Sequence, residues 1–318
     1  MSYFSDNEVL FQQTLVYVLL AISLQVVLRC GVVSLASIGF YTLGAYASAI
    51  AIKHDWPPAA ILPLVVLASG GLGYAFGKPL AKLRGLYLAM ATLAFDLVLP
   101  VLLINGGDFT GGALGLYAIP LSITTGSLAV IVVVVVLAVS QIERGWMGRA
   151  SLALRSDENL ARSMGVRVTR ERYLAFAISA ALGGLAGALS AMLFRAVSPG
   201  NGGFTLITLG LTMAIIGGRD SWVGAVIGAY LVTWVPEWLR FVGTWRSLVF
   251  GLVLVAVMLF FPDGLLGAGR RTYGRLRGRW SRHDHAPGTG APGPGPAGAA
   301  GPRAVRGPRP DRVRAAAD

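Results

Sequence analysis

The sequence has few charged residues, one cysteine and three histidines. Only 13% of its 318 residues are charged, whereas 55% are hydrophobic and the mean hydropathy is +0.66. Because a soluble domain carries about twice that share of charge, this composition predicts a membrane protein of the all-α class. Cys30 has no cysteine with which to form an internal disulfide bond. The histidines fall in a loop and in the tail, so we expect no metal site, no catalytic triad and no cofactor held by this chain.

Charge-free windows recur along the chain and predict a polytopic helix bundle of about nine spans, within a range of eight to ten. The first windows are long enough for the roughly 20 residues that cross a bilayer core. Only Arg29 separates the first two windows, so we expect a tight turn there. The expected spans are 9–28, 30–52, 56–77, 85–105, a fifth that ends at residue 142, 173–194, a seventh within 196–218 after a loop at 197–204, 221–236 and 247–262.

The two ends of the chain differ from the apolar region between them. Residues 1–8 form a short polar head without the features of a cleaved signal peptide, so we expect the first span to remain in the protein. From Arg270 the tail holds eleven arginines and three aspartates, so +8 of the formal net charge of +12 lies there. We expect residues 268–318 to be disordered and to bind anionic lipid headgroups. Without a folded module beside the charge, nucleic acid is not an expected partner.

The stretch 143–172 is the longest charged interruption, with seven arginines and four acidic residues. Small and apolar residues recur in it at three- and four-residue steps, which predicts one short amphipathic helix outside the bilayer. Gly165 can end this helix in the left-handed conformation. The expected inward or docking face consists of Ala150, Ala153, Leu154, Leu160, Ala161 and Met164, with Arg149, Arg155 and Glu158 mostly on other faces. A plain connector at the membrane surface is the alternative interpretation.

Lysine and arginine predict the orientation. The basic loop 78–84, the stretch 143–172 and the tail lie on one side of the membrane if nine spans alternate. The positive-inside rule assigns that side to the cytoplasm. We therefore expect the N-terminus outside and the C-terminus in the cytoplasm.

Asp96 falls in the middle of the fourth window. A carboxylate at this depth costs about 2.5–3.5 kcal/mol, so it should face protein or water. Either an ion relay or structural hydrogen bonding can explain it, and we favour the structural role. Small or polar residues within apolar windows are candidates for lining a translocation path, although close packing explains them equally well. These candidates are Ser37, Phe40, Tyr41, Tyr87, Thr92, Gly183 and Gly187.

A nucleotide-binding loop is not expected in this chain. The nearest sequence, Gly77-Lys78-Pro79, has proline where the phosphate loop needs serine or threonine, and Leu72 where it needs the first glycine. We therefore expect no enzyme activity here. Any energy from ATP would come from another subunit.

Five stretches, taken in order, resemble one family. The loop sequence GRASLALRSDENLARSMGV, with Glu158, Ala161 and Gly165, is similar to the "EAA" loop of ABC importer permeases. The stretches at 32–50, 82–95, 176–199 and 249–267 resemble the LivM-like branched-chain amino acid permeases in the same order. The resemblance covers about residues 10–267, which makes 9–267 the permease domain and 143–172 its cytoplasmic coupling loop.

The resemblance implies an inner-membrane permease subunit of an ATP-driven importer. Its partners would be a second, LivH-like permease, two cytoplasmic ATP-binding subunits and an extracytoplasmic substrate-binding protein. Its cargo would be branched-chain amino acids, with urea and amides carried by close relatives. The residues that would contact the ATPase or shape the coupling helix are Arg149, Ala150, Arg155, Glu158, Ala161 and Gly165. A secondary transporter that uses Asp96 as its coupling carboxylate is the alternative function, and a membrane scaffold is a third.

Overall fold

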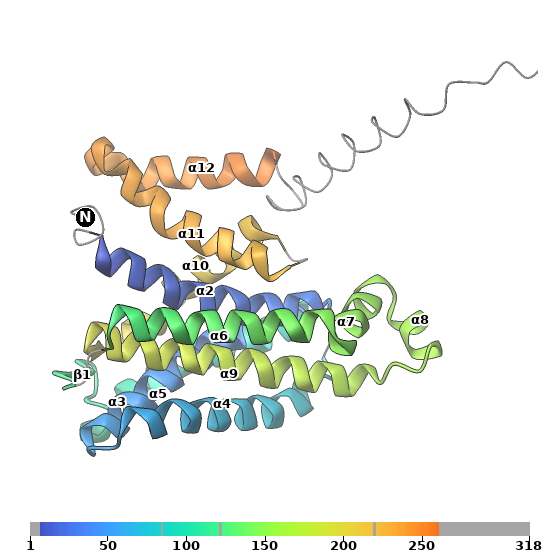
Figure 1. Cartoon of the computed structure of the whole chain (residues 1–318), viewed down its shortest axis with the longest axis horizontal. Helices are drawn as coiled ribbons and strands as arrows, with labels where there is room; N and C mark the ends of the chain where they lie inside the picture. The colour runs from blue at the N-terminus through green and yellow to red at the C-terminus, as the bar shows by residue number, and fades with distance from the viewer. Residues whose placement is uncertain (1–6, 84, 121–122, 219–220, 261–318) are drawn as a thin grey trace, which may run out of the picture. The chain divides into compact units, whose positions relative to one another are not determined.

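The computed structural model describes residues 7–83, 85–120, 123–218 and 221–260, and these residues are mostly helical (Figure 1). The predictions for most of the polar head and for the whole tail lie outside the described residues. Nine of the described helices are long: α2 (Glu8–Arg29), α3 (Ala36–Lys53), α4 (Pro58–Leu80), α5 (Leu86–Ile104), α6 (Thr125–Arg144), α9 (Val168–Phe194), α10 (Phe204–Gly217), α11 (Trp222–Trp238) and α12 (Arg246–Phe260).

Shorter elements connect them. Two helices, α7 (Trp146–Ser156) and α8 (Glu158–Ser163), lie between α6 and α9. The remaining short elements are η1 (Gly107–Phe109), β1 (Leu116–Tyr117), β2 (Ala196–Val197), η2 (Pro199–Gly202) and η3 (Leu239–Trp245). Strands β1 and β2 pair antiparallel, with Leu116 opposite Val197, so the expected all-α fold carries one small two-stranded ribbon.

Six described segments are long and apolar enough to cross a membrane, fewer than the nine that the sequence predicted. They are α2, α4, α5, α6, α9 and the segment Trp222–Phe241. The loop expected at 197–204, before the seventh span, is confirmed, because β2 and η2 occupy it and α10, of only 14 residues, follows. Pro199 lacks a backbone N–H, and the glycines that follow favour the helix weakly. The helix therefore begins only at Phe204.

The second expected span begins later than predicted. Residues 30–35 form a turn and an irregular segment after α2, with Gly31 at φ +73°, and α3 starts at Ala36. The expected position of the first turn is confirmed, because α2 ends at Arg29, but the connection to α3 is longer than a tight turn.

Helix α9 packs against α2, α3 and α4. Its glycines make the contact with α3 close: a Cβ at Gly183 would overlap the carbonyl oxygen of Ser37, and a Cβ at Gly187 would overlap that of Tyr41. Between membrane helices, small residues let backbones approach where the hydrophobic effect gives little attraction. Helix α2 also contacts α10 and α11. It therefore lies between the α9 group and the α10–α11 pair (Figure 1).

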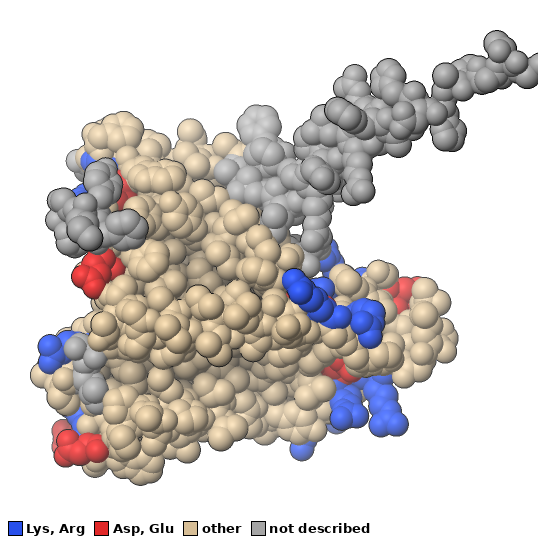
Figure 2. All heavy atoms as spheres, viewed as in Figure 1, with Lys and Arg blue, Asp and Glu red and all other residues tan. Residues whose placement is uncertain are grey.

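The two ends of the bundle differ in charge. Helices α7 and α8 lie at one end, and the β1–β2 ribbon lies at the other (Figure 1). In the view of Figure 2, lysine and arginine side chains gather mainly near α7 and α8, while the middle of the bundle shows almost none. This is the distribution of a helix bundle whose centre is surrounded by lipid.

The contact between α3 and α9 predicts that Gly187→Ala destabilises the protein. The added methyl group would overlap the Tyr41 carbonyl oxygen, and overpacking of this kind costs about 1–3 kcal/mol. The control is Gly71→Ala on α4, where a Cβ meets no atom within 4 Å. We expect the melting temperature of the detergent-purified protein to fall for Gly187→Ala only. Equal melting temperatures for both variants would contradict this account of the packing.

Candidate functional site

The charged stretch folds into two helices, so the prediction of a single amphipathic helix is wrong. We call α7 and α8, Trp146–Ser163, the α7–α8 unit. Asp157 interrupts it with an extended backbone, and its Oδ1 accepts hydrogen bonds from the Asn159 N–H (2.8 Å) and the Leu160 N–H (3.2 Å). Aspartate is a strong helix N-cap. A second helix therefore begins at Glu158.

This break divides the expected docking face. Ala150, Leu154 and Ala161 are buried, and Leu154 and Ala161 pack with Val168 of α9. Leu160 is 58% exposed and Met164 is 71% exposed. The small residues thus hold the unit against its own chain, and the larger apolar side chains point outward.

One ion pair ties α8 to the start of α9, and a second lies within α8. The Glu158 carboxylate lies 2.6 Å from Nη2 of Arg162 and 3.1 Å from Nη2 of Arg172. Gly165 has φ +83°, so the left-handed conformation expected at the end of the helix is confirmed. This backbone conformation favours glycine because a side chain would be strained there.

The other residues predicted for coupling lie near the ends of α2 and α6. Arg149 donates from Nη1 to the Arg144 carbonyl oxygen at 3.3 Å. A Cβ at Gly31, in the turn after α2, would lie 3.3 Å from Cα of Arg155. The C-terminal end of α7 therefore packs directly on that turn.

Six of the seven predicted path residues come together on α3, α5 and α9. Ser37, Phe40, Tyr41 and Thr92 are buried, and Gly183 and Gly187 contact α3 as described above. Tyr87 lies apart from them and is 77% exposed. These six residues lie in closely packed contacts between helices, so a path along them would have to open through movement of the helices. Their role stays a prediction.

Asp96 and Thr92, one turn apart on α5, bind the start of α3. Thr92 Oγ1 accepts from the Leu35 N–H at 3.1 Å, and Asp96 Oδ1 accepts from the Gly39 N–H at 2.8 Å. Because helix starts leave N–H groups without helical partners, a helix that begins inside the bundle needs such acceptors. This geometry gives Asp96 a structural role, although its buried Oδ2 has no hydrogen-bond partner among the described residues.

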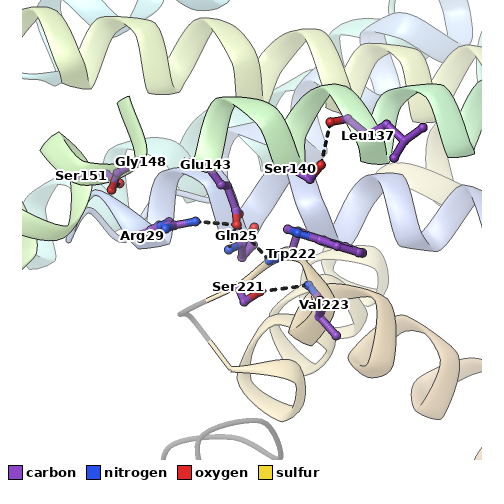
Figure 3. A network of polar contacts seen from close by, with 10 residues as sticks. All are labelled: Gln25, Arg29, Leu137, Ser140, Glu143, Gly148, Ser151, Ser221, Trp222 and Val223. Carbon is purple, nitrogen blue, oxygen red and sulfur yellow. Dashed lines mark hydrogen bonds and ion pairs between the residues drawn. The ribbon is translucent and has the colours of Figure 1, made fainter. Parts of the chain in front are cut away.

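A buried polar junction joins α2, α6 and α11, and the sequence analysis did not predict it (Figure 3). The Glu143 carboxylate of α6 lies 2.6 Å from Nη1 of Arg29 and accepts from Gln25 Nε2 at 3.1 Å, both on α2. It also accepts from the backbone N–H of Trp222, the first residue of α11, at 3.5 Å. We call Gln25, Arg29, Glu143 and Trp222 the Glu143 junction.

Burial makes this junction sensitive to change. The Arg29 and Glu143 side chains are only 10% and 12% exposed. Removal of one partner from a buried ion pair costs about 3–5 kcal/mol, because the other charge is left uncompensated. The sequence signal was present in hindsight: both residues interrupt or end apolar windows, where a lone charge is costly.

Two recesses open beside the junction. A recess of about 540 Å³ is lined by Arg29, Ser140, Glu143, Arg144, Leu152, Ser221 and Trp222. A smaller recess, of about 40 Å³, has Arg29 and Glu143 on one side and Met147, Gly148 and Ser151 of α7 on another. The junction thus lies at the base of the α7–α8 unit.

Long apolar helices and a charged helical unit at one end define a polytopic helical membrane protein. The sequence profile of the family described as "Branched-chain amino acid transport system / permease component" matches residues 8–260. The chain belongs to this family, which confirms the resemblance found in the sequence, and its relatives are permease subunits of transporters, not enzymes.

Two similar proteins are described as high-affinity branched-chain amino acid transport system permease protein LivM. The Salmonella typhimurium protein is 32% identical and the Escherichia coli K12 protein 31% identical, each over 290 residues that cover 80% of this chain and 68% of the relative. The autoinducer 2 import system permease protein LsrC of Yersinia enterocolitica is 26% identical. The match covers 81% of this chain and 74% of the LsrC chain. No solved structure matches the chain.

The hydrogen bond to Gly39 predicts that Asp96→Asn keeps the protein folded, because the amide oxygen of asparagine can replace Oδ1. Asp96→Leu should lower the melting temperature, since an unsatisfied buried N–H costs about 1–3 kcal/mol. Thermal unfolding in detergent compares the two variants with the unchanged protein. Equal destabilisation by asparagine and leucine would mean that the negative charge, and not the hydrogen bond, holds α3.

Proposed function

We propose that this chain is the permease subunit of an ATP-driven importer that carries branched-chain amino acids or similar small polar solutes. The observation that carries the proposal is the family match over residues 8–260, which includes every described helix. The LivM relatives supply the substrate class by their printed descriptions. The LsrC relatives suggest that the cargo varies among similar permeases. Urea and short amides therefore stay within the proposal.

We infer nine membrane crossings, with α3, α10 and α12 as the short ones. Successive long helices run in alternating directions between the two ends of the bundle (Figure 1). At a rise of about 1.5 Å per residue, the 18 residues of α3 span nearly the roughly 30 Å of a bilayer core. The basic residues near α7 and α8 support a cytoplasmic location for that end, and hence for the C-terminus.

The α7–α8 unit is then the part that docks on an ATP-binding subunit. Its inner face is held by the packing of Ala161 and by the ion pair between Glu158 and Arg172. A movement of the unit would therefore displace α9. Leu160 in α8 and Met164, the C-cap directly after it, are outward apolar side chains among charged residues. Exposed apolar groups rimmed by polar residues are typical of protein interfaces. The proposed assembly has two ATP-binding subunits, a second LivH-like permease and an extracytoplasmic substrate-binding protein.

The alternative function, ion-driven transport through Asp96, has one observation in its favour: its buried Oδ2 has no hydrogen-bond partner in the part of the chain that the structure describes. Against it, Oδ1 already serves as an acceptor for the backbone of α3. The energy source for uptake, ATP or an ion gradient, distinguishes the two functions directly.

The test of the function is uptake of radiolabelled leucine, urea and acetamide into cells with and without the chain. An ATP-depleting agent and a proton uncoupler are applied separately. We expect leucine uptake to depend on the chain and to stop on ATP depletion but not on uncoupling. Uptake that stops with the uncoupler alone would replace the proposal with Asp96-dependent transport.

Docking through α8 predicts that Leu160→Glu and Met164→Glu weaken assembly with the ATP-binding subunits. Truncated or charged interface centres typically weaken binding roughly tenfold or more. The readout is the amount of ATP-binding subunit that copurifies, together with solute uptake. The control is Phe109→Glu in η1, an equally exposed apolar side chain at the opposite end of the bundle. Unchanged copurification with Leu160→Glu and Met164→Glu would remove α8 from the proposed interface.

A further inference from the structure

The start of α7 is built directly on Glu143. Glu143 is the second-last residue of α6, and only Gly145 separates α6 from α7. A Cβ at Gly148, in the first turn of α7, would overlap the Glu143 carbonyl oxygen. The backbone of Glu143 and the first turn of α7 are thus in contact without any side chain between them. Movement of α7 must act on Glu143.

The side chain of the same residue contacts two other helices. Its carboxylate binds Arg29 and Gln25 of α2 and the first N–H of α11 (Figure 3). An anionic side chain at a helix N-terminus is favourable, because the first N–H groups point at it and the helix dipole is positive there. Glu143 therefore links the base of α7 to the ends of α2 and α11.

These helices are also bound together at their opposite ends. Gln12 of α2 donates to Thr125 of α6 at 2.6 Å, and Trp234 of α11 donates from Nε1 to Thr14 of α2 at 3.1 Å. With polar contacts at both ends, α2, α6 and α11 are held as one group. Glu143 provides the contacts at the α7 end of that group.

We propose that Glu143 is a positioning residue that makes α2 and α11 follow the movement of the α7–α8 unit. The proposal rests on the proposed function, because it needs an ATP-binding subunit to move that unit. Arg29 and Gln25 are the receiving groups on α2, and the Trp222 N–H is the receiving group on α11. In this arrangement the buried ion pair transmits force between helices, in addition to stabilising the fold.

The test uses the complete transporter in proteoliposomes, with substrate uptake and ATP hydrolysis measured on the same sample. The main variant is the double substitution Arg29→Ala with Glu143→Ala, which removes the link and leaves no unpaired buried charge to unfold the protein. The conservative variant Glu143→Gln keeps an oxygen that can accept from the Trp222 N–H. The matched control is Glu237→Ala with Arg240→Ala, which removes an ion pair of 2.7 Å between neighbouring turns and outside the junction.

We expect the main variant to assemble and hydrolyse ATP while its solute uptake per ATP falls roughly two- to thirtyfold, the range for residues that carry coupling. Glu143→Gln should lie between it and the unchanged protein, and the control pair should change nothing. The proposal would be overturned if the main variant took up as much solute per ATP as the unchanged protein, whether or not its uptake and hydrolysis both fell. If the main variant does not assemble, the ratio for Glu143→Gln decides by the same criterion.

A distance measurement gives a readout that is independent of solute identity. Spin labels at Trp146→Cys on α7 and Trp238→Cys on α11, both exposed positions, are placed in a Cys30→Ser chain. When ATP binds, the distance between the labels should stay constant in the otherwise unchanged complex and change in the main variant. The same change in both would overturn the proposal. If the complex without the Arg29 and Glu143 substitutions shows no ATP-driven uptake, the proposed function is refuted, and the role of Glu143 with it.

Discussion

Close backbone contact between helices is the constraint on which the rest of the bundle depends. Helix α9 approaches α3 so closely that Gly183 and Gly187 have no room for a Cβ beside the carbonyl oxygens of Ser37 and Tyr41. In lipid such contacts replace the hydrophobic effect as the source of helix association. They hold in place the start of α3, which in turn needs Thr92 and Asp96 as hydrogen-bond acceptors.

Polar side chains inside the bundle also require close contact between helices. A charge within or at the end of an apolar helix must find its partner inside the protein. Asp96 meets a backbone N–H, and Glu143 meets Arg29, Gln25 and the start of α11. The first contact joins α5 to α3, which in turn packs closely on α9. The second joins helices on the other side of α2, where it borders the α7–α8 unit. The polar contacts thus lie where neighbouring helices must keep a fixed relation.

The sequence was sufficient for the class of fold and for most helix positions, because charge-free windows and small-residue spacing are local signals. It placed the loop before α10, where one proline and its neighbouring glycines interrupt an apolar stretch, but it did not predict the pairing of β2 with β1. It also missed the division of the α7–α8 unit, since Asp157 has the same charge in a helix interior as at a helix cap. The Glu143 junction joins residues 25, 29, 143 and 222, and no local pattern predicts contacts at such separations.

The packing also suggests where movement can and cannot occur. Six of the predicted path residues lie in the contacts of α3 with α5 and α9, which close packing makes stiff. A path through them can open only if whole helices shift as rigid bodies, the mode of movement expected for tightly packed elements. Rigid-body movement needs strong links between the helices that move together and weaker contacts elsewhere. The buried Glu143 carboxylate, with partners on two helices and α7 built on its own backbone, has the properties of such a link.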